Sequence, residues 1–406
     1  TNLYIIKNNE NLVPFDQLNR KFRSVSFGDT SPVFDDALNL FVSIQNNQDL
    51  NSDSVSDLNF NDILIVSFHA DSAYSSGDYL RDLSFLNRVH KELVVAVVFG
   101  NPSLINDFPI QNVDALIHCP STEVNYKRAV AHLLFGAIGT NPQLSGESSI
   151  QTKANGRLSF SSLEEAHLSP SRFEKIDHIA QRGIIEGAFP GCQILVSIKD
   201  SIVFRKSYGS HTYDPNSKKA TNDDVYDIAS ITKIAGSTLI AMYLEYRNML
   251  DIDDTLGNYI PEITGNTEYS KIKIREMLAH QSGLKSWIPF YLKTMSEGQL
   301  RKDLYKSEPD SVYSIQVANN IYLRNDYTKT MYDRILSTNL GTKKYKYSDL
   351  CYYFTQKVFE NILNQKQEVF LHEMIYEPLG LRNIRYLPLD YFEKEYGFLS
   401  KRDYKD

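Results

Sequence analysis

The chain has 406 residues, of which 42% are hydrophobic and 23% are charged, and its formal net charge is −7. This composition excludes a mainly disordered chain and leaves room for two or three domains. The acidic balance disfavours a nucleic-acid partner, because phosphate backbones attract basic surfaces. The longest apolar stretch, Leu93 to Phe99, is strand-sized and far below the ~20 residues that span a bilayer, so we expect no transmembrane segment.

The first 140 residues alternate short β-rich runs with helical patterns. The expected strands are Arg23 to Phe27, Asp62 to Phe68, Leu93 to Phe99 and Ala115 to Cys119. The expected helices are Val33 to Ile44, Tyr79 to Lys91 and Thr122 to Phe135. Uniformly apolar strands between helices predict an α/β sandwich with a mostly parallel sheet. No glycine-rich phosphate fingerprint follows any of these strands, so nothing supports nucleotide binding.

The composition and the hydrophobic periodicity of the sequence change after residue 140. Residues 141–169 are rich in turn-forming dipeptides and lack periodicity, which predicts a linker between domains covering 1–140 and 170–406. The second domain is expected to begin with a helix from Pro170 to Glu186. An antiparallel hairpin should follow, with strands Cys192 to Ile198 and Ser201 to Tyr208.

The stretch Tyr226 to Lys233 carries the clearest chemical signal. Ser230 lies where a helical pattern begins, and Lys233 follows one turn later on the same side, so its amine can reach the Ser230 hydroxyl. A buried Lys with a lowered pKa can take the proton of a serine nucleophile, and the helix N-terminus favours a developing oxyanion. The alternative is an N-capping serine beside a solvated lysine.

Further motifs follow in a fixed order along the second domain. They are Pro190-Gly191-Cys192 before a hairpin ending in Tyr208-Gly209, Asp251-Ile252-Asp253-Asp254 with Tyr259-Ile260-Pro261, Met277 to Leu284 (MLAHQSGL), Tyr347-Ser348-Asp349-Leu350, and Glu377 to Leu381 (EPLGL). Together with the Ser-x-x-Lys stretch, they resemble the serine β-lactamase and penicillin-binding-protein superfamily, in particular its class C-like branch of esterases and peptidases. The resemblance implies an α+β fold of the β-lactamase/transpeptidase type.

The resemblance also implies roles for individual residues. Ser230 is the acylated nucleophile, Lys233 assists its deprotonation, and Tyr347 relays a proton to the leaving group. Asp349 stands where β-lactamases carry Asn. Its carboxylate either holds Lys233 charged or simply pairs with it, and this departure weakens a β-lactamase assignment.

Four other residues are expected around the cleft. His280 and Ser282 belong to the MLAHQSGL motif, and the resemblance places His280 in a structural turn beside the cleft, in preference to a catalytic base. Trp287 and Tyr291 follow that turn and form either an aromatic wall for the substrate or part of a packed lid.

The histidines and cysteines do not predict a metal-binding site. The sequence has 9 His and 3 Cys, and Cys119, Cys192 and Cys351 lie far apart. Their spacing matches no metal-ligand pattern and rules out a disulfide framework. We therefore expect no metal and no cofactor.

The N-terminal region has a likeness of its own. Leu3 to Asn8 and Asn11 to Pro14 resemble the opening of the C-terminal α/β sandwich of family-three glycoside hydrolases, and Leu134 to Gly139 resembles its closing turn. Such a hydrolase fused to a class C-like serine hydrolase is typical of Bacteroidetes-type envelope proteins. The pairing implies a role in peptidoglycan metabolism, in the periplasm or cell envelope, beside a β-N-acetylhexosaminidase-type glycosidase.

The superfamily's third motif, Lys/His-x-Gly, is absent from Arg382 to Asp406. We therefore expect a piece of a longer protein that lacks the last catalytic strand and is weakly active or inactive by itself. The expected function is a serine hydrolase that forms an acyl-enzyme on an amide or ester, taken from a small molecule or from peptidoglycan. The alternative is an idle scaffold or wall-binding module. The sequence does not choose among esterase, D-aminopeptidase, carboxypeptidase and β-lactamase, and it predicts no oligomeric state.

Overall fold

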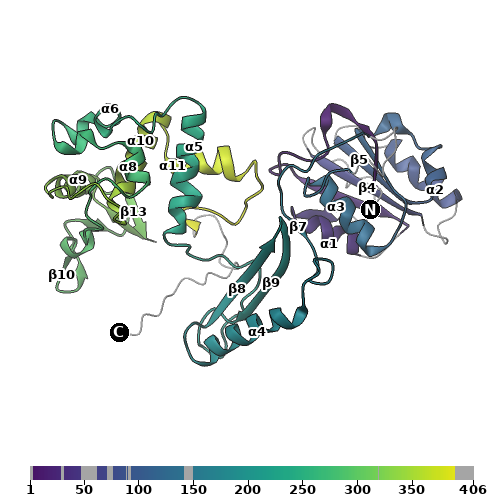
Figure 1. Cartoon of the computed structure of the whole chain (residues 1–406), viewed down its shortest axis with the longest axis horizontal. Helices are drawn as coiled ribbons and strands as arrows, with labels where there is room; N and C mark the ends of the chain where they lie inside the picture. The colour runs from purple at the N-terminus through teal and green to yellow at the C-terminus, as the bar shows by residue number, and fades with distance from the viewer. Residues whose placement is uncertain are drawn as a thin grey trace. The chain divides into compact units, whose positions relative to one another are not determined.

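The computed structural model (Figure 1) describes residues 3–28, 32–46, 62–70, 76–87, 89, 93–140, 150–318 and 320–388. The chain divides into two compact units, of which one combines Thr1–Asp227 with Met374–Asp406 and the other is Ile228–Glu373. The domain boundaries expected near residues 140 and 170 stay predictions. In the described parts, no helix is both long and apolar enough to cross a membrane.

The first unit contains a six-stranded mixed sheet with the order β1-β6-β5-β4-β2-β3. Its strands are β1 (Tyr4–Asn8), β2 (Phe22–Phe27), β3 (Ile44–Asn46), β4 (Ile63–Ala70), β5 (Leu93–Gly100) and β6 (Ala115–Cys119). Only β1 runs antiparallel to its neighbour β6, and the other described pairs are parallel. The mostly parallel sheet that the apolar runs predict is therefore present, with one antiparallel edge strand.

Helices cover both faces of this sheet (Figure 1). The helices are α1 (Val33–Asn39), α2 (Ser76–Leu83) and α3 (Val124–Leu134), and the short 3₁₀ turns are η1 (Asn9–Asn11), η2 (Ser84–Asn87), η3 (Pro102–Ile105) and η4 (Ile110–Asn112). Alternate residues of β5 point into different cores: Val97 packs with α1 and α3, whereas Val98 packs with α2. This period of two explains why the central strands are apolar along their whole length.

Two of the expected helices are shorter than predicted. The helix from Val33 ends at Asn39, whose side-chain oxygen accepts a hydrogen bond from the Ile44 N–H at 2.8 Å. Ile44 then begins β3, which pairs with β2, so sheet pairing outweighs the helical pattern there. The helix expected over Tyr79 to Lys91 ends at Leu83 and continues as η2. Residues 88 and 90–92 lie outside the described residues.

The described half of the expected linker is structured. The Ile150 N–H donates to the Ile5 carbonyl at 2.8 Å, and the Arg157 guanidinium donates to the carbonyls of Phe15 and Phe135 at 2.6 and 3.0 Å. A two-residue strand follows, β7 (Ser159–Phe160), and pairs with the strand Ser201–Gly209, β9. Ile150 and Arg157 thus contact the segments around the six-stranded sheet, whereas β7 joins the hairpin strand β9; residues 141–149 lie outside the described residues.

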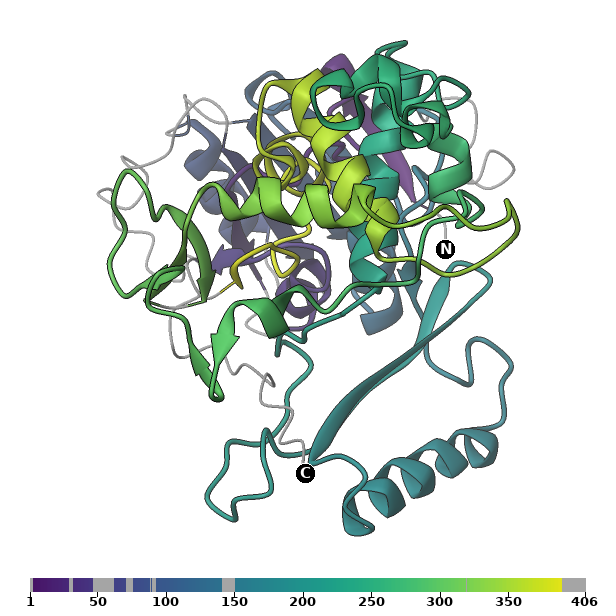
Figure 2. The same ribbon diagram turned by 90° about the vertical axis from the view of Figure 1, so that its left-hand side faces the viewer.

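The expected helix and hairpin after the linker are both present. They are α4 (Pro170–Ile185), β8 (Gly191–Ile198) and β9 (Ser201–Gly209), drawn in teal in Figure 2. Lys199 and Asp200, with φ of 49° and 62°, form the tight connection between the strands, as two-residue hairpin turns require. Phe173 of α4 packs on Phe204 of β9, with ring centroids 5.6 Å apart.

The second unit is mainly helical. Its α-helices are α5 (Leu239–Tyr246), α6 (Leu256–Tyr259), α7 (Pro261–Thr264), α8 (Ile274–Leu278), α9 (Tyr327–Leu336), α10 (Leu350–Leu363) and α11 (Gln367–Leu371). Its short strands are β10 (Met295–Ser296), β11 (Gln299–Leu300), β12 (Tyr305–Lys306), β13 (Ile315–Ala318) and β14 (Ile321–Leu323). The other turns are the 3₁₀ elements η6 (Glu268–Lys271) and η7 (Phe290–Lys293) and the π-helices η5 (Lys233–Thr238) and η8 (His372–Tyr376), the last of which crosses the unit boundary.

Helix α10 organises the core of this second unit. Its side chains Leu350, Phe354, Val358 and Phe359 are fully buried, and it contacts α6, α8, α11 and η5. The first turn of α10 follows the Tyr347-Ser348-Asp349 motif directly, and η5 begins three residues after Ser230. The packing of α10 therefore places two of the sequence motifs beside each other.

Candidate active site

The predicted nucleophile lies at a sharp turn before a helical segment. Ala229 has φ of +45°, in the left-handed region that residues with a Cβ seldom adopt, and Ser230 follows with an exposed side chain. The Lys233 N–H donates to the Ser230 carbonyl at 3.1 Å, which closes the first helical turn. Within the described residues, the Ser230 N–H donates to no acceptor, so it is available to an oxyanion.

Lys233 contacts both the predicted nucleophile and a carboxylate. Its Nζ donates a hydrogen bond to Ser230 Oγ at 3.0 Å and forms an ion pair with Asp349 Oδ1 at 2.7 Å. The Lys233 side chain is 16% exposed and the Asp349 side chain 49% exposed, so solvent reaches this pair mainly from the side of the carboxylate. Asp349 thus joins the Ser-Lys pair although it lies more than one hundred residues further along the chain.

The contacts of Lys233 set the direction of its pKa. Burial by itself lowers the pKa of Lys233, but its contacts with Asp349 and Tyr347 outweigh burial, and the pKa is raised above its ordinary value. This direction favours the expectation that the Asp349 carboxylate holds Lys233 charged over the expectation that burial leaves the amine neutral.

Tyr347 completes the cluster. The Lys233 Nζ lies 5.1 Å from the centroid of the Tyr347 ring, and the interactions of the phenol with Lys233 and then Ser230 lower the pKa of Tyr347 below its ordinary value. Because Tyr347 is 42% exposed, its hydroxyl remains open to an incoming molecule. The structure thus brings Ser230, Lys233, Tyr347 and Asp349 together.

Tyr352 is a fourth side chain around Lys233, after Ser230, Asp349 and Tyr347, and the sequence motifs did not indicate it. Its ring centroid lies 5.3 Å from Lys233 Nζ, and burial raises the pKa of its phenol. The available signal was its position in the first turn of α10, five residues after Tyr347. Tyr352 therefore forms an aromatic side of the Lys233 environment.

The turn after α8 holds the Tyr347-Ser348-Asp349 segment in place. The Asp349 N–H donates to the Ser286 carbonyl at 2.8 Å, and the Ser348 hydroxyl donates to the Lys285 carbonyl at 2.6 Å. His280 contributes an acceptor, because its Nδ1 lies 3.1 Å from the Ser348 nitrogen. His280 of the MLAHQSGL motif and the residues Lys285 and Ser286 that follow the motif thus support the site through hydrogen bonds to the Tyr347-Ser348-Asp349 segment.

The remaining predicted cleft residues fall into two kinds. Ser282 is only 2% exposed, with its hydroxyl 3.4 Å from Cys351 Sγ, so it lies in the packed interior beneath the site. Trp287 and Tyr291 are 57% and 55% exposed and follow Ser286, whose carbonyl accepts from Asp349. The structure places these two aromatic side chains at the surface, and their role as a substrate wall stays a prediction.

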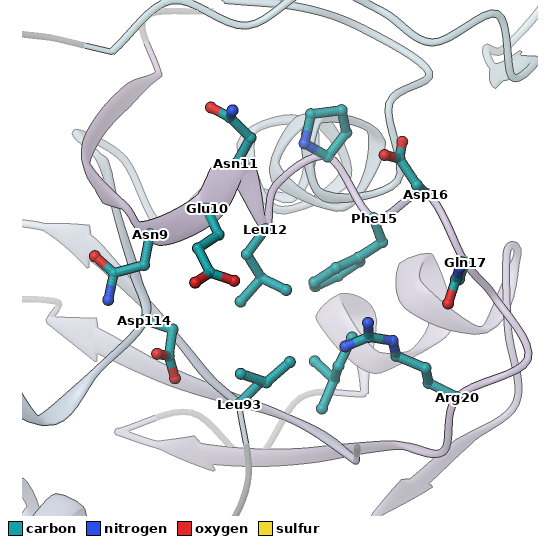
Figure 3. A pocket seen from close by; sticks show the side chains of 12 residues that line it. Asn9, Glu10, Asn11, Leu12, Phe15, Asp16, Gln17, Arg20, Leu93 and Asp114 are labelled. Atoms are coloured by element: carbon teal, nitrogen blue, oxygen red, sulfur yellow. The ribbon is translucent and has the colours of Figure 1, made fainter. Parts of the chain in front are cut away.

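A cavity of about 570 Å³ lies in the first unit (Figure 3). It is lined by Asn9, Glu10, Asn11, Leu12, Pro14, Phe15, Asp16, Gln17, Arg20, Ile63, Leu93 and Asp114. Ile63 and Leu93 begin β4 and β5, so the cavity lies at the amino ends of the parallel strands, opposite to the edge where α/β sheets usually bind ligands. In the described portion of the chain, no group of three or more His, Cys, Asp or Glu side chains is arranged to hold a metal ion.

Comparison with known families identifies the family to which the chain belongs. The family model described as Beta-lactamase matches residues 175–404, which include Ser230, Lys233, Tyr347 and Asp349. The chain belongs to the beta-lactamase family. This family includes serine hydrolases that act on amides and esters, and the chain is a member over more than half of its length.

Curated relatives match the same region. The chain is 29% identical over 238 residues to the N-acetylmuramyl-L-alanine amidase of Bacillus subtilis, which covers 56% of the chain and 49% of that protein. It is 25% identical over 247 residues to a protein of Escherichia coli K12 named "Putative D-alanyl-D-alanine carboxypeptidase", covering 57% of the chain and 51% of that protein. The chain therefore spans about half the length of these relatives.

Solved structures also match about half of the chain. EstCE1, described as a hydrolase with promiscuous acyltransferase activity, shows 20% identity and a TM-score of 0.38, over 52% of this chain and 51% of that one. A class C beta-lactamase in complex with cefoxitin shows 15% identity and a TM-score of 0.39, over 52% and 51%.

Proposed function

We propose that this beta-lactamase family member is a serine hydrolase that forms an acyl-enzyme on Ser230. One observation carries the proposal: Ser230 Oγ lies 3.0 Å from Lys233 Nζ, and the same amine pairs with Asp349 at 2.7 Å. Tyr347, with its lowered pKa, interacts with both Ser230 and Lys233. A nucleophile, a cation and a proton acceptor thus meet at one exposed position.

The charges favour Tyr347 as the group that takes the Ser230 proton. A protonated Lys233 cannot accept a proton, whereas its positive charge stabilises the Tyr347 phenolate. In the first step, Ser230 Oγ bonds to the carbonyl carbon of the substrate while its proton passes to the Tyr347 oxygen. The C–N or C–O bond then breaks, and Tyr347 returns the proton to the departing amine or alcohol.

The second step releases the acyl group. Water donates a proton to Tyr347 and attacks the acyl carbon, and the ester bond to Ser230 breaks as the proton returns to Ser230 Oγ. During both steps the Ser230 N–H stabilises the oxyanion. We propose no metal and no cofactor, because each proton and each bond is accounted for by these side chains.

For the substrate, we propose an amide or ester of a small molecule or of a peptidoglycan fragment, in the cell envelope. The supporting observations are the names of the amidase and carboxypeptidase relatives, together with the exposed Trp287 and Tyr291 near the site. We also propose that residues 1–140 are the C-terminal sandwich of a family-three glycoside hydrolase in a fused cell-wall protein. The mixed sheet with helices on both faces is compatible with that proposal.

Covalent labelling tests the proposed function. A fluorophosphonate probe, and separately a fluorescent penicillin, is incubated with the wild type, with Ser230→Ala and with Ser171→Ala, which changes an exposed serine of α4. Intact-mass measurement should show one adduct on the wild type and on Ser171→Ala and none on Ser230→Ala. The same labelling is carried out on the full-length natural protein, and a full-length protein that acquires no adduct on Ser230 from either probe would instead support an idle scaffold.

A further inference from the structure

We infer that His280 is a positioning residue that clamps the backbone on both sides of Tyr347 and thereby holds the Tyr347 phenol against Ser230 and Lys233. This inference rests on the proposed acyl-enzyme chemistry and adds a residue with a defined protonation state to it. None of the contacts described for His280 is to Ser230 or to a substrate. We therefore infer that His280 affects the reaction indirectly, by holding Tyr347 in position.

Two hydrogen bonds form the clamp. The Lys346 N–H donates to the His280 carbonyl at 2.8 Å, and the Ser348 N–H donates to His280 Nδ1 at 3.1 Å. The residues immediately before and after Tyr347 are thus both bound by one residue. A segment held on both flanks loses the freedom to rotate Tyr347 away from its partners.

Ring contact adds a third restraint. The imidazole of His280 and the phenol ring of Tyr347 have centroids 4.5 Å apart at an interplanar angle of 36°. The rings of Tyr352 and Tyr345 approach the same imidazole at 5.7 and 6.2 Å. Three tyrosine rings therefore surround His280, and one of them carries the proposed proton acceptor.

The backbone conformation of His280 allows it to make both hydrogen bonds. Its φ of +54° lies in the left-handed region at the end of α8, where its N–H donates to the Met277 carbonyl at 3.0 Å. This conformation directs the carbonyl and the side chain of His280 toward the same segment. Asn adopts it more readily than most residues do, which makes Asn a useful replacement.

The clamp requires a neutral imidazole. A ring nitrogen that accepts from the Ser348 N–H carries no proton, so the proton of His280 resides on Nε2. Burial and then the charge of Lys233 lower the pKa of His280, against smaller opposing effects of Ser348 and Asp349. The groups facing the ring are Lys233, Asp349 and the phenols of Tyr345, Tyr347 and Tyr352. Below the pKa, a second N–H would face the Ser348 N–H and open the clamp.

Substitutions that keep or remove the acceptor test the inference. The oxygen of His280→Asn can occupy the place of Nδ1, whereas His280→Leu has no acceptor, and His178→Asn changes an exposed histidine of α4 as a matched control. The second-order rate of fluorophosphonate labelling is measured from pH 5 to 9. We expect His280→Leu to fall about 10²-fold and His280→Asn to fall less than about tenfold.

The pH profile separates positioning from mere folding. Titration of Tyr347 lowers the labelling rate toward acid in both proteins. Below the pKa of His280 the wild type should fall more steeply, and His280→Asn should lack this second, steeper fall because Asn does not titrate. Equal rates and equal acid limbs for the wild type and His280→Leu would overturn the clamp. If neither the wild type nor the full-length natural protein is labelled, the proposed function fails while the clamp is still tested by the NMR measurement that follows.

Nitrogen NMR of ¹⁵N-histidine-labelled wild type provides that measurement. The His280 signals are identified by their loss in His280→Asn. We expect Nε2 to carry the proton at pH 7 and Nδ1 to show the shift of an unprotonated acceptor. A proton on Nδ1 at pH 7 would overturn the clamp, whatever the activity of the protein.

Discussion

At the residue scale, the site depends on a balance of opposing effects at Lys233. Burial alone would neutralise this amine, and a neutral amine would be the base for Ser230. The ion pair with Asp349 at 2.7 Å and the contact with Tyr347 reverse the direction, so Lys233 stays charged. We therefore propose the neighbouring phenol of Tyr347, whose pKa the same charge lowers, as the proton acceptor.

Tyr347→Phe tests the role of the phenol. This change removes one oxygen and keeps the ring beside His280, so we expect an intact fold and a labelling rate lowered by about 10²–10⁴-fold. In the wild type, the rate should rise with pH as the phenol approaches a pKa that lies below its ordinary 10.0. Stopped-flow labelling across pH 6 to 10 measures both effects, and a rising limb retained by Tyr347→Phe would assign the limb to another group.

Asp349→Asn tests the origin of the Lys233 charge. Without the carboxylate, burial acts against the contact with Tyr347 alone, so the pKa of Lys233 should fall. A group with a raised pKa keeps its proton to higher pH. Removing the Asp349 carboxylate should therefore let Lys233 lose its proton at lower pH. The fall of the labelling rate on the alkaline side should move to lower pH with it. Asp333→Asn, an exposed change on α9, should leave that fall in place.

At the element scale, short loops position the site more than long helices do. The turn after α8 and the segment before α10 meet through backbone hydrogen bonds, among them Gly341 N–H to the Gly283 carbonyl at 2.7 Å. Gly283 has φ of +78°, and a Cβ there would lie 2.5 Å from the Gly341 oxygen. A glycine is required at this position by both its conformation and the close approach of the second loop.

Gly283→Ala should disturb this junction. Left-handed strain and the clash with Gly341 are each expected to cost about 1–3 kcal/mol, so the unfolding free energy should fall by about 2–6 kcal/mol. Labelling of Ser230 should slow as well, because the loop carrying Tyr347 and Asp349 shifts. Urea unfolding followed by circular dichroism gives the first quantity and labelling in buffer gives the second. Gly298→Ala, at φ of +74° with open space around it, shares the conformational strain without the clash.

At the scale of the whole molecule, the chain contains two compact units, each with buried apolar side chains of its own. The first unit buries its apolar side chains on both faces of the six-stranded sheet, and the second packs its helices around α10. The site residues Ser230, Lys233, Tyr347 and Asp349 all belong to the second unit. The chemistry proposed for Ser230 therefore depends on the core of that unit.

Phe99→Ala tests whether the two interiors behave separately. Phe99 of β5 is fully buried, and its removal should cost about 3–5 kcal/mol in the first unit. We expect calorimetry to show one transition shifted to lower temperature and a second one unchanged, with normal labelling of Ser230 at 20 °C. Phe354→Ala in α10 should shift the other transition and slow the labelling. A single transition that moves with both variants would contradict separate interiors.

The sequence by itself determined the elements whose signals are local. The apolar runs predict β4, β5 and β6, the Lys199-Asp200 connection predicts the hairpin β8–β9, and the spacing of Ser230 and Lys233 predicts their contact, because these patterns depend only on neighbouring residues. The ordered motifs also predicted the family, which the match over residues 175–404 confirms.

Only the tertiary structure decided how distant segments meet. Asp349 reaches Lys233, and His280 reaches the backbone around Tyr347, across separations that no sequence period encodes. The contact with Asp349 sets the direction in which the pKa of Lys233 shifts. Pairing of Ile44 with β2 ended the helix that begins at Val33, which the sequence pattern predicted to continue to Ile44. The physical reason is that charge and packing act through space, so their outcome depends on which segments the fold brings together.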